Sequence, residues 1–372
     1  MTDVRILCGA NGSSLAEEIS GILSIPAKCV NSYADWAAMR AGPERGRPAT
    51  AADYSQDSRI EIPENVRGRD VYVIQSTCST PDEHSKNIVE LMLILTALRR
   101  SAARRVYAVI PYFAYCRQTQ KRRGREPISG ADVSMLFEDV GVDHVITVDI
   151  FREQTAGFFS PLCAFDSLSY LPVSARFFWK QGLRNPVVVA PHASTMPKAV
   201  EVYEAFRELH DHVAMAEGGA EGLGGIQGLT GLDSTTSGVG LQREMWDSLS
   251  CASSEVEPGT GRDRSWTGGG NSPSLAMLLP VRRDGAKIME LTGDVEGRDC
   301  VVVDDIIDSG STVKRSTDEL LARGARSVSF FATHGLFSDD AFDIIEATQC
   351  RALACLNPAT SGLRRSPARS HA

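Results

Sequence analysis

An acidic pair followed by small hydroxyl residues is the segment of this sequence best suited to chemistry. The pair is Asp304 and Asp305, which follow the short apolar run 300–303. Residues 308–312, with the sequence D-S-G-S-T, come next. Carboxylates accept hydrogen bonds from vicinal ribose hydroxyls or hold Mg²⁺ through water, and the N–H groups of a small-residue loop hold a phosphate. This order of residues predicts a binding site for a sugar phosphate.

The elements that position this segment follow from its pattern. The unbroken apolar run 300–303 is typical of a strand buried on both faces. Residues 313–323 are predicted to form a helix that ends at Gly324, with its positive end directed at the phosphate. A capped turn is the simpler interpretation of D-S-G-S-T, because Asp, Ser and Thr favour helix N-termini. The apolar strand and the doubled aspartate favour the binding site.

Strands alternate with helices along the rest of the chain. We predict strands at 4–8, 70–74, 106–111 and 144–149, and helices from residue 15 and over 88–100. This alternation implies the α/β class, with mostly parallel sheets flanked by helices. A length of 372 residues favours two domains of ordinary size.

Composition excludes several classes of function. The net charge of −8 argues against a nucleic-acid surface. No apolar run approaches the ~20 residues that span a bilayer, and the first residues lack the apolar core of a secretion signal. The nine cysteines show no C-x-x-C pairs or zinc-ligand spacing, which favours reduced thiols. We therefore expect a cytoplasmic protein with no nucleic-acid partner and no membrane partner.

Several long runs resemble the ribose-phosphate diphosphokinase (phosphoribosyl pyrophosphate synthetase) family. Within residues 67–159 they are R-G-R-D-V-Y-V-I-Q-S-T-C, E-L-M-L-I-L-T-A-L-R-R, A-V-I-P-Y-F-A-Y-C-R-Q and G-V-D-H-V-I-T-V-D, and A-T-H-G-L-F-S follows the segment around Asp304. The resemblance implies two phosphoribosyltransferase-like (type I) domains and assembly into oligomers. It also implies transfer of the diphosphoryl group of Mg-ATP to ribose 5-phosphate, giving 5-phosphoribosyl 1-diphosphate and AMP for nucleotide biosynthesis.

The same resemblance divides the chain. Residues 1–165 are the expected N-terminal domain, with an inserted loop at 37–57. Residues 166–349 are the expected C-terminal domain, which carries the ribose-phosphate loop and an insertion at 216–273. The insertion is rich in Gly, Ser and Thr and is predicted to be disordered. Residues 350–372 form a tail rich in Arg, Ser and Pro, which we expect to be unstructured.

The resemblance also assigns a role to residues at each end of the substrate site. Those matched to ribose-phosphate binding are Asp304, Asp305, Asp308, Ser309, Gly310, Ser311 and Thr312. Those matched to ATP binding are Arg117 and Gln118, with Tyr33 and Asp35 offered across a subunit interface. Arg283 matches a catalytic cation of the loop that closes over the transferring group. Asp149, and more weakly His192, are the expected ligands of Mg²⁺.

Several positions depart from the family's pattern, and four of them bear most directly on catalysis and on substrate binding. Phe151 stands where the family has a metal-linked histidine, and a benzyl ring neither ligates a metal nor donates a hydrogen bond. His192 replaces an aspartate, which weakens a Mg²⁺ site. Val281 replaces a lysine, and losing a cation that contacts developing charge costs on the order of 10²–10³ in rate. At the adenine end, Trp36 replaces a glycine.

These departures predict a family member whose own catalytic activity is impaired. The alternative is a non-catalytic regulatory subunit that binds ribose phosphate or nucleotide and forms hetero-oligomers with active paralogues. Compensation elsewhere in the chain would instead leave an active enzyme. A phosphoribosyltransferase is disfavoured, because no other segment resembles a base-recognising hood.

Overall fold

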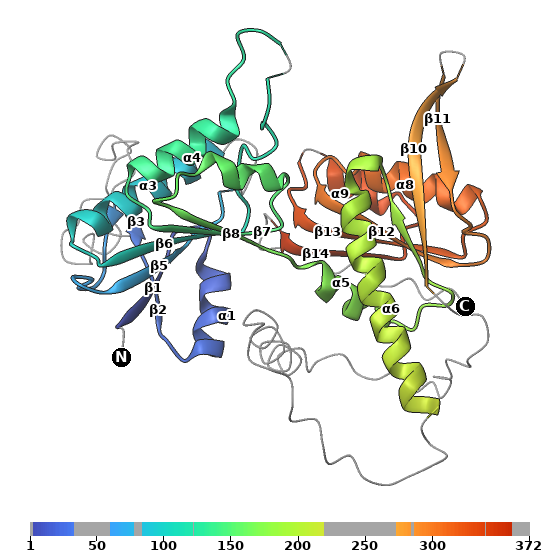
Figure 1. Ribbon diagram of the computed structural model, residues 1–372, viewed down its shortest axis with the longest axis horizontal. Helices are drawn as coiled ribbons and strands as arrows, with labels where there is room; N and C mark the ends of the chain where they lie inside the picture. The colour runs from blue at the N-terminus through green and yellow to red at the C-terminus, as the bar shows by residue number, and fades with distance from the viewer. Residues whose placement is uncertain are drawn as a thin grey trace, which may run out of the picture.

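The computed structural model describes residues 3–32, 60–77, 84–121, 123–218, 273–283, 286–338 and 340–358. Two six-stranded sheets, one from each half of the chain, lie side by side with helices on both faces of each (Figure 1). This arrangement confirms the predicted α/β class. The predicted loop at 37–57 and residues 219–272 of the predicted insertion lie outside the described residues.

The first sheet has the strand order β2-β1-β5-β6-β7-β8, and all of its neighbouring strands are parallel. The elements of this half are β1 (Val4–Cys8), α1 (Ser13–Leu23), β2 (Ala27–Cys29), β3 (Asn31–Ser32), β4 (Ile60–Glu61), β5 (Asp70–Ile74), α3 (His84–Arg100), β6 (Arg105–Ile110), α4 (Ser129–Asp139), β7 (His144–Val148), the 3₁₀ helix η3 (Glu153–Phe158) and β8 (Ala164–Leu168). The predicted strands and helices of this half are confirmed to within a few residues at their ends.

Successive side chains of a strand point to opposite faces, and this alternation builds two cores on the first sheet. Ile6 and Cys8 of β1 pack with Ala16 of α1 on one face. Leu7 lies on the other face, in the core that α3 and α4 cover. Figure 1 shows α1 below the sheet and α3 and α4 above it.

The second sheet has the order β11-β10-β9-β12-β13-β14, in which only β10 and β11 are antiparallel. Its half contains α5 (Leu171–Trp179), β9 (Val187–Ala190), the 3₁₀ helix η4 (Ala193–Thr195), α6 (Met196–Gly218), β10 (Ser274–Arg283), β11 (Ala286–Thr292), β12 (Asp299–Ile307), α8 (Ser311–Ala322), β13 (Ser327–Gly335), α9 (Ala341–Glu346) and β14 (Ala352–Pro358).

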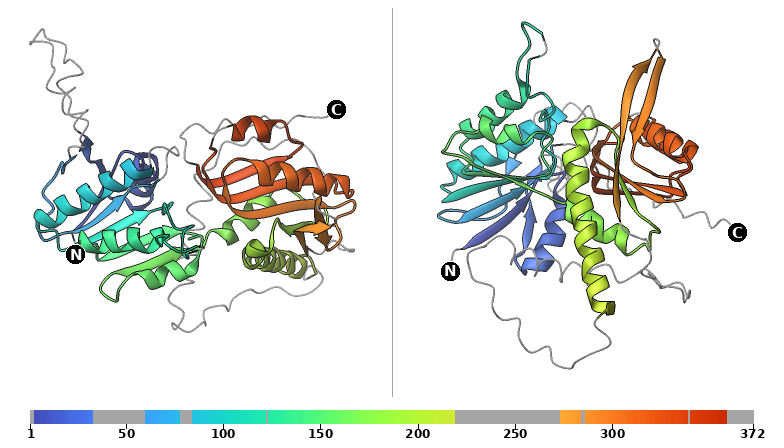
Figure 2. Two further views of the ribbon diagram at one scale, coloured as in Figure 1. Left: turned by 90° about the horizontal axis from the view of Figure 1, so that it is seen from above. Right: turned by 45° about the vertical axis from the view of Figure 1, so that its right-hand side comes forward.

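Strand β12 is the buried centre of the second half. Every residue from Asp299 to Ile307 is buried, as the apolar run predicted. Val301 and Val303 pack with α5 and α6, whereas Cys300 and Val302 pack on the side of α8 and α9. The left-hand view in Figure 2 shows these two helix layers on opposite faces of the sheet.

The end of the described chain differs from the expectation of an unstructured tail. Residues 352–358 form β14, which pairs in parallel with β13 from Ser329 to Gly335. The expectation is therefore wrong for these residues. The alternating sequence A-L-A-C-L supplies Leu353 and Cys355, which pack on the core of the second sheet, so this strand covers the edge of β13.

The boundary between the halves follows β8. This strand pairs with β7, so the first sheet continues to Leu168, past the predicted boundary at residue 165. Among the helices of the described ranges, none is both long enough and apolar enough to cross a membrane.

Candidate functional site

A cavity of about 340 Å³ opens at the carboxyl end of β12. All seven residues predicted to bind ribose phosphate line it, from Asp304 through Thr312, together with Arg117, Phe151 and His192. The carboxyl ends of parallel strands are where α/β sheets bind ligands, and the volume is that of a small-molecule site. The structure therefore brings together the segment that the sequence singled out.

The acidic pair lies at the base of this cavity. Asp304 is 2% exposed and Asp305 is 8% exposed. Burial, followed by repulsion from the charge of Asp304, raises the pKa of Asp305 to about 6. Two buried carboxylates side by side favour a cation or several hydroxyl donors between them. Such partners are what a metal-bound sugar offers.

The loop after β12 turns into α8 through a conformation that glycine adopts without strain. Gly310 has φ +72°, and a Cβ on it would lie 3.0 Å from the Ala341 carbonyl oxygen and from Ile345 Cγ1. Within the described residues, no side chain caps α8 at Gly310. The first N–H groups of this helix, which begins at Ser311, can thus donate to an anion, and their role in binding a phosphate stays a prediction.

His192 reaches the acidic pair from the neighbouring strand. It follows β9, which pairs with β12. Its Nε2 lies 3.5 Å from Asp304 Oδ1, and its Nδ1 lies 2.8 Å from Ser194 Oγ. The contact with Asp304 raises the pKa of His192 against the opposing effect of burial. The imidazole therefore lies against one carboxylate of the acidic pair.

Phe151 and Arg117, which belong to the first half of the chain, also line this cavity. Arg117 Nη1 lies 3.1 Å from Asp308 Oδ2, which joins the two halves through an ion pair. The guanidinium carbon of Arg117 stands 6.0 Å from the centroid of the Phe151 ring, at the limit of a cation–π contact. Phe151 is thus part of the cavity wall, at the position where the resembled family has histidine.

Gln118, the second predicted ATP contact of this segment, is not among the residues that line the cavity. It is exposed, and its Oε1 accepts a hydrogen bond of 2.7 Å from Ser129 Oγ. Tyr33 and Asp35, the other two, lie outside the described residues. The ATP assignments stay predictions.

Asp149 lies in the seam between the two halves and is not among the cavity's lining residues. Its carboxylate accepts hydrogen bonds from Thr333 Oγ1 at 2.7 Å and from the Tyr170 N–H at 3.2 Å, and burial raises its pKa. In the same seam His334 Nε2 donates to the Val148 carbonyl at 3.0 Å. Burial lowers the pKa of His334 to about 4, so its imidazole is neutral. The role of Asp149 as a metal ligand stays a prediction.

Lys198, in the first turn of α6, is a cation that sequence reasoning missed. Its Nζ is buried and makes no hydrogen bond within the described residues. Its charge lowers the pKa of both Asp149 and Asp305, in opposition to their burial. The sequence feature that could have identified Lys198 is its position, six residues after His192 in the segment that follows an apolar strand.

Arg283 is the last residue of β10, where its backbone pairs with Ala286 of β11. Only residues 274–277 of β10 pair with β9, so the rest of β10 and its partner form a two-stranded arm. This arm projects from the second sheet (Figure 1). The segment expected to close over the substrate is therefore a hairpin in this structure, and the catalytic role of Arg283 stays a prediction.

The described residues hold no group of three or more His, Cys, Asp or Glu side chains arranged around one metal position. Asp304 and Asp305 nevertheless fit Mg²⁺ as ligands through water, since they are buried, adjacent and acidic. His192 fits less well, because its pKa is raised beside Asp304.

Two family models match this chain. The model described as the N-terminal domain of ribose phosphate pyrophosphokinase matches residues 4–141, and the phosphoribosyl synthetase-associated domain matches residues 253–365. A ribose-phosphate pyrophosphokinase of Vibrio parahaemolyticus is 34% identical over 288 residues, which are 77% of this chain and 70% of the relative. One of Rhizobium meliloti is 29% identical over 354 residues, 94% of this chain and 86% of the relative.

A solved structure supports the fold. The crystal structure of phosphoribosylpyrophosphate synthetase from Mycobacterium smegmatis matches with a TM-score of 0.66 and 22% sequence identity. The match covers 95% of this chain and 88% of that one. Both halves thus share the architecture of that protein.

Proposed function

Because this chain belongs to the ribose-phosphate pyrophosphokinase family, we propose that its cavity binds ribose 5-phosphate and Mg-ATP and forms 5-phosphoribosyl 1-diphosphate and AMP at a low rate. The observation that carries this proposal is the shared cavity lined by the acidic pair, the loop before α8 and Arg117. It offers acceptors for sugar hydroxyls, donors for a phosphate and a cation in one place.

In this reaction the anomeric hydroxyl attacks the β-phosphorus of ATP and AMP leaves in line. Such a transfer depends on positioning and on charge stabilisation more than on covalent help. The N–H groups at the start of α8 hold the 5-phosphate, and Asp304 and Asp305 accept from the ribose hydroxyls. These contacts fix the anomeric oxygen, and Arg117 and Gln118 are the proposed contacts to ATP.

Mg²⁺, when bound, neutralises charge on the diphosphoryl oxygens, and Asp304 and Asp305 are the residues that we expect to hold it through water. The other proposed ligands, Asp149 and His192, are engaged with Thr333 and Asp304 respectively. We expect weak metal retention for this reason.

The low rate that we propose follows from two side chains that replace catalytic groups of the family. Phe151 presents an apolar ring to the cavity where a hydrogen-bonding group would stabilise developing charge. Val281, in β10, supplies no cation. Arg283 remains the proposed catalytic residue of this segment.

A second candidate is a regulatory subunit that binds ribose phosphate or nucleotide without turning it over and forms hetero-oligomers with active paralogues. Phe151 in the cavity wall favours this candidate. The proposed binding residues are present, whereas the wall lacks a catalytic group at this position. If the chain is such a subunit, Tyr33 and Asp35 would contact ATP bound to a paralogue across the subunit interface. A cytoplasmic location stays a prediction.

The test measures binding and turnover separately. Purified protein is titrated calorimetrically with ribose 5-phosphate and assayed for AMP release from Mg-ATP, alone and mixed with an active paralogue. We expect ribose 5-phosphate to bind and AMP to form slowly. Asp304→Asn should abolish binding, whereas Asp318→Asn, on the exposed face of α8, is the matched control.

Turnover at the rate of the relatives would exclude both the low rate and the regulatory candidate. Altered AMP release by the paralogue, with none from this chain alone, would favour the regulatory subunit. Absence of ribose 5-phosphate binding in a folded protein would overturn both.

A further inference from the structure

Two thiols in the first half lie in contact, far from the cavity in the fold. Cys8 ends β1 and Cys29 ends the edge strand β2, and the two are register partners in the parallel pair. Their Sγ atoms are 2.7 Å apart. Paired strands lie about 4.8 Å apart, which falls within the Cα separations that disulfides span. A bond between these atoms therefore needs a movement of less than about 1 Å.

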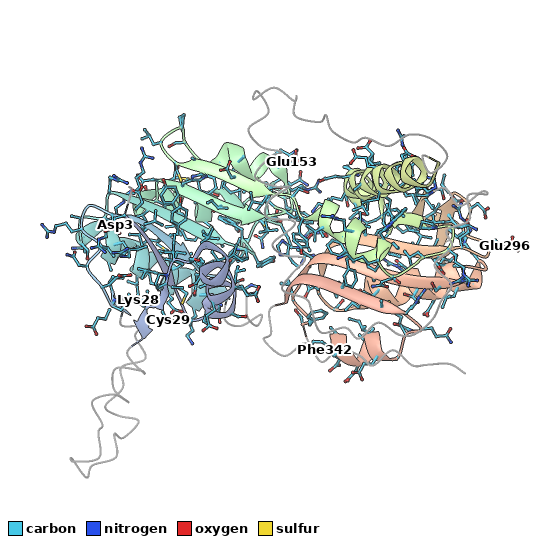
Figure 3. All side chains as sticks on the ribbon, turned by 90° about the horizontal axis from the view of Figure 1, so that it is seen from below. Asp3, Lys28, Cys29, Glu153, Glu296 and Phe342 are labelled. Atoms are coloured by element: carbon cyan, nitrogen blue, oxygen red, sulfur yellow. The ribbon has the colours of Figure 1, made fainter. Side chains whose placement is uncertain are left out.

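The two thiols differ in exposure. Cys8 is 1% exposed beneath α1, whereas Cys29 is exposed on the outer strand next to Lys28 (Figure 3). An oxidant in solution therefore reaches the exposed Cys29 thiol first, and the Cys8 thiol lies in contact with it on the buried side. This is the arrangement of an accessible thiol with a resolving partner.

Three other described cysteines are protected. Cys116, Cys163 and Cys300 are buried. Burial raises their pKa to about 11 for Cys116 and Cys163 and to about 12 for Cys300. Since the thiolate is the reactive form, burial and a raised pKa both slow the reaction of these three thiols with an oxidant.

We propose that Cys8 and Cys29 form a reversible disulfide when the protein meets a hydroperoxide. The Cys29 thiolate attacks the peroxide, the O–O bond breaks, and a sulfenic acid forms with release of water or an alcohol. The Cys8 sulfur then attacks the Cys29 sulfur, the S–O bond breaks and a second water leaves. Two thiols lose two electrons and two protons, and the peroxide accepts both.

The order of these steps follows from the two environments. Burial and the contact with Cys29 raise the pKa of Cys8 to about 12, so Cys8 is a thiol at neutral pH and does not react first. Its attack on the sulfenic acid is assisted by contact, because neighbouring groups held in place react as at very high local concentration.

The crosslink closes a loop from residue 8 to residue 29 that contains α1, and it ties the edge strand to its neighbour. Restricting a loop of this length in the unfolded chain stabilises the fold. We expect the melting temperature to rise by up to about 6 °C on oxidation. The inference does not depend on the proposed function.

The sequence provides a direct readout. Trypsin cleaves after Lys28, so Cys8 and Cys29 fall in separate peptides, residues 6–28 and 29–40. The full chain is treated with hydrogen peroxide, alkylated and digested without reductant, and the crosslinked pair is sought by mass spectrometry. We expect the pair in the treated protein, its loss after a dithiol reductant, and a melting temperature that returns to the reduced value.

Cys29→Ser, a change at an exposed position, should remove both the crosslink and the thermal shift. Cys350→Ser, in the second half, is the matched control and should keep both. The proposal is overturned if peptide 29–40 carries a sulfinic acid while Cys8 stays free. It is also overturned if the treated wild-type protein yields no crosslinked pair although Cys29 is alkylated readily before treatment.

Discussion

His192 Nε2 lies 3.5 Å from Asp304 Oδ1, so a ring that follows β9 lies against a carboxylate of the adjacent strand β12. The contact raises the pKa of His192, against the opposing effect of burial. The imidazole therefore already contacts a carboxylate that we propose as a ligand of Mg²⁺ through water.

We expect His192→Asp to bind Mg²⁺ or Mn²⁺ about tenfold more tightly, which corresponds to about 1.4 kcal/mol between partly buried charges. Removing an imidazole whose pKa is raised and adding a carboxylate both act in this direction. Manganese binding followed by electron paramagnetic resonance measures the affinity. His192→Asn separates the two effects, and equal affinities in all three proteins would show that position 192 does not face the metal.

Restoring the two missing catalytic groups should raise the rate. Phe151→His gives the cavity wall a hydrogen-bonding ring, and Val281→Lys adds a cation to β10. Together we expect AMP formation to increase by on the order of 10²–10³. A coupled assay of AMP release gives the rate, and Phe177→His, at an exposed phenylalanine of α5, is the control. An unchanged rate in the folded double variant would mean that these two positions do not limit catalysis.

Gly310→Ala should weaken phosphate binding and destabilise the protein. The new Cβ meets the Ala341 carbonyl oxygen at 3.0 Å in a backbone with φ +72°. We expect a loss of about 1–3 kcal/mol in the free energy of unfolding, measured by urea titration, and weaker ribose 5-phosphate binding. Gly182→Ala isolates the backbone cost, because Gly182 has φ +64° and nothing within 4 Å of its Cβ position. Equal losses in the two variants would rule out crowding at the loop.

Binding of ribose 5-phosphate should depend on pH through Asp305. Its pKa is raised to about 6, so it gains a proton as the pH falls through that value and then accepts fewer hydrogen bonds. Affinity is therefore expected to fall below pH 6. The charge of Lys198 lowers this pKa, so Lys198→Met should move the loss of affinity to higher pH, whereas Lys198→Arg should not.

Calorimetric titrations between pH 5 and 8 measure this shift, and the difference between variants cancels the titration of the ligand's own phosphate. A shift of one pH unit corresponds to about 1.4 kcal/mol of interaction between the two charges. Superimposable pH profiles for the wild-type protein and Lys198→Met would show that Lys198 does not act on Asp305.

The loop from Asp304 to Thr312 could be predicted from the local sequence because all of its residues are contiguous. An apolar run, two acids, small residues and a helix occupy one stretch, so pattern alone placed them in one cavity. The contributions of Phe151, Arg117 and His192 come from other strands. Their positions near Asp304 were suggested by family resemblance, and their contacts became visible only in the folded chain.

Two structural features could not be predicted from the sequence, for different physical reasons. Residues 352–358 lie next to a tail rich in Arg and Pro, and their short alternation is a strand only because β13 offers an edge to pair with. Lys198 resembles any surface lysine in the sequence. The burial of its Nζ depends on how the start of α6 packs in the folded chain, which no local pattern encodes.

The polar seam between the halves has a consequence for how the molecule moves. Asp149 accepts from Thr333, and His334 donates to Val148, and the side chains of Asp149, Thr333 and His334 are buried. A rigid hinge opening would separate these groups from their partners, which costs about 1–3 kcal/mol for each buried group left unsatisfied. We therefore expect substrate entry to depend more on local motion of side chains and loops at the mouth of the cavity than on separation of the two sheets.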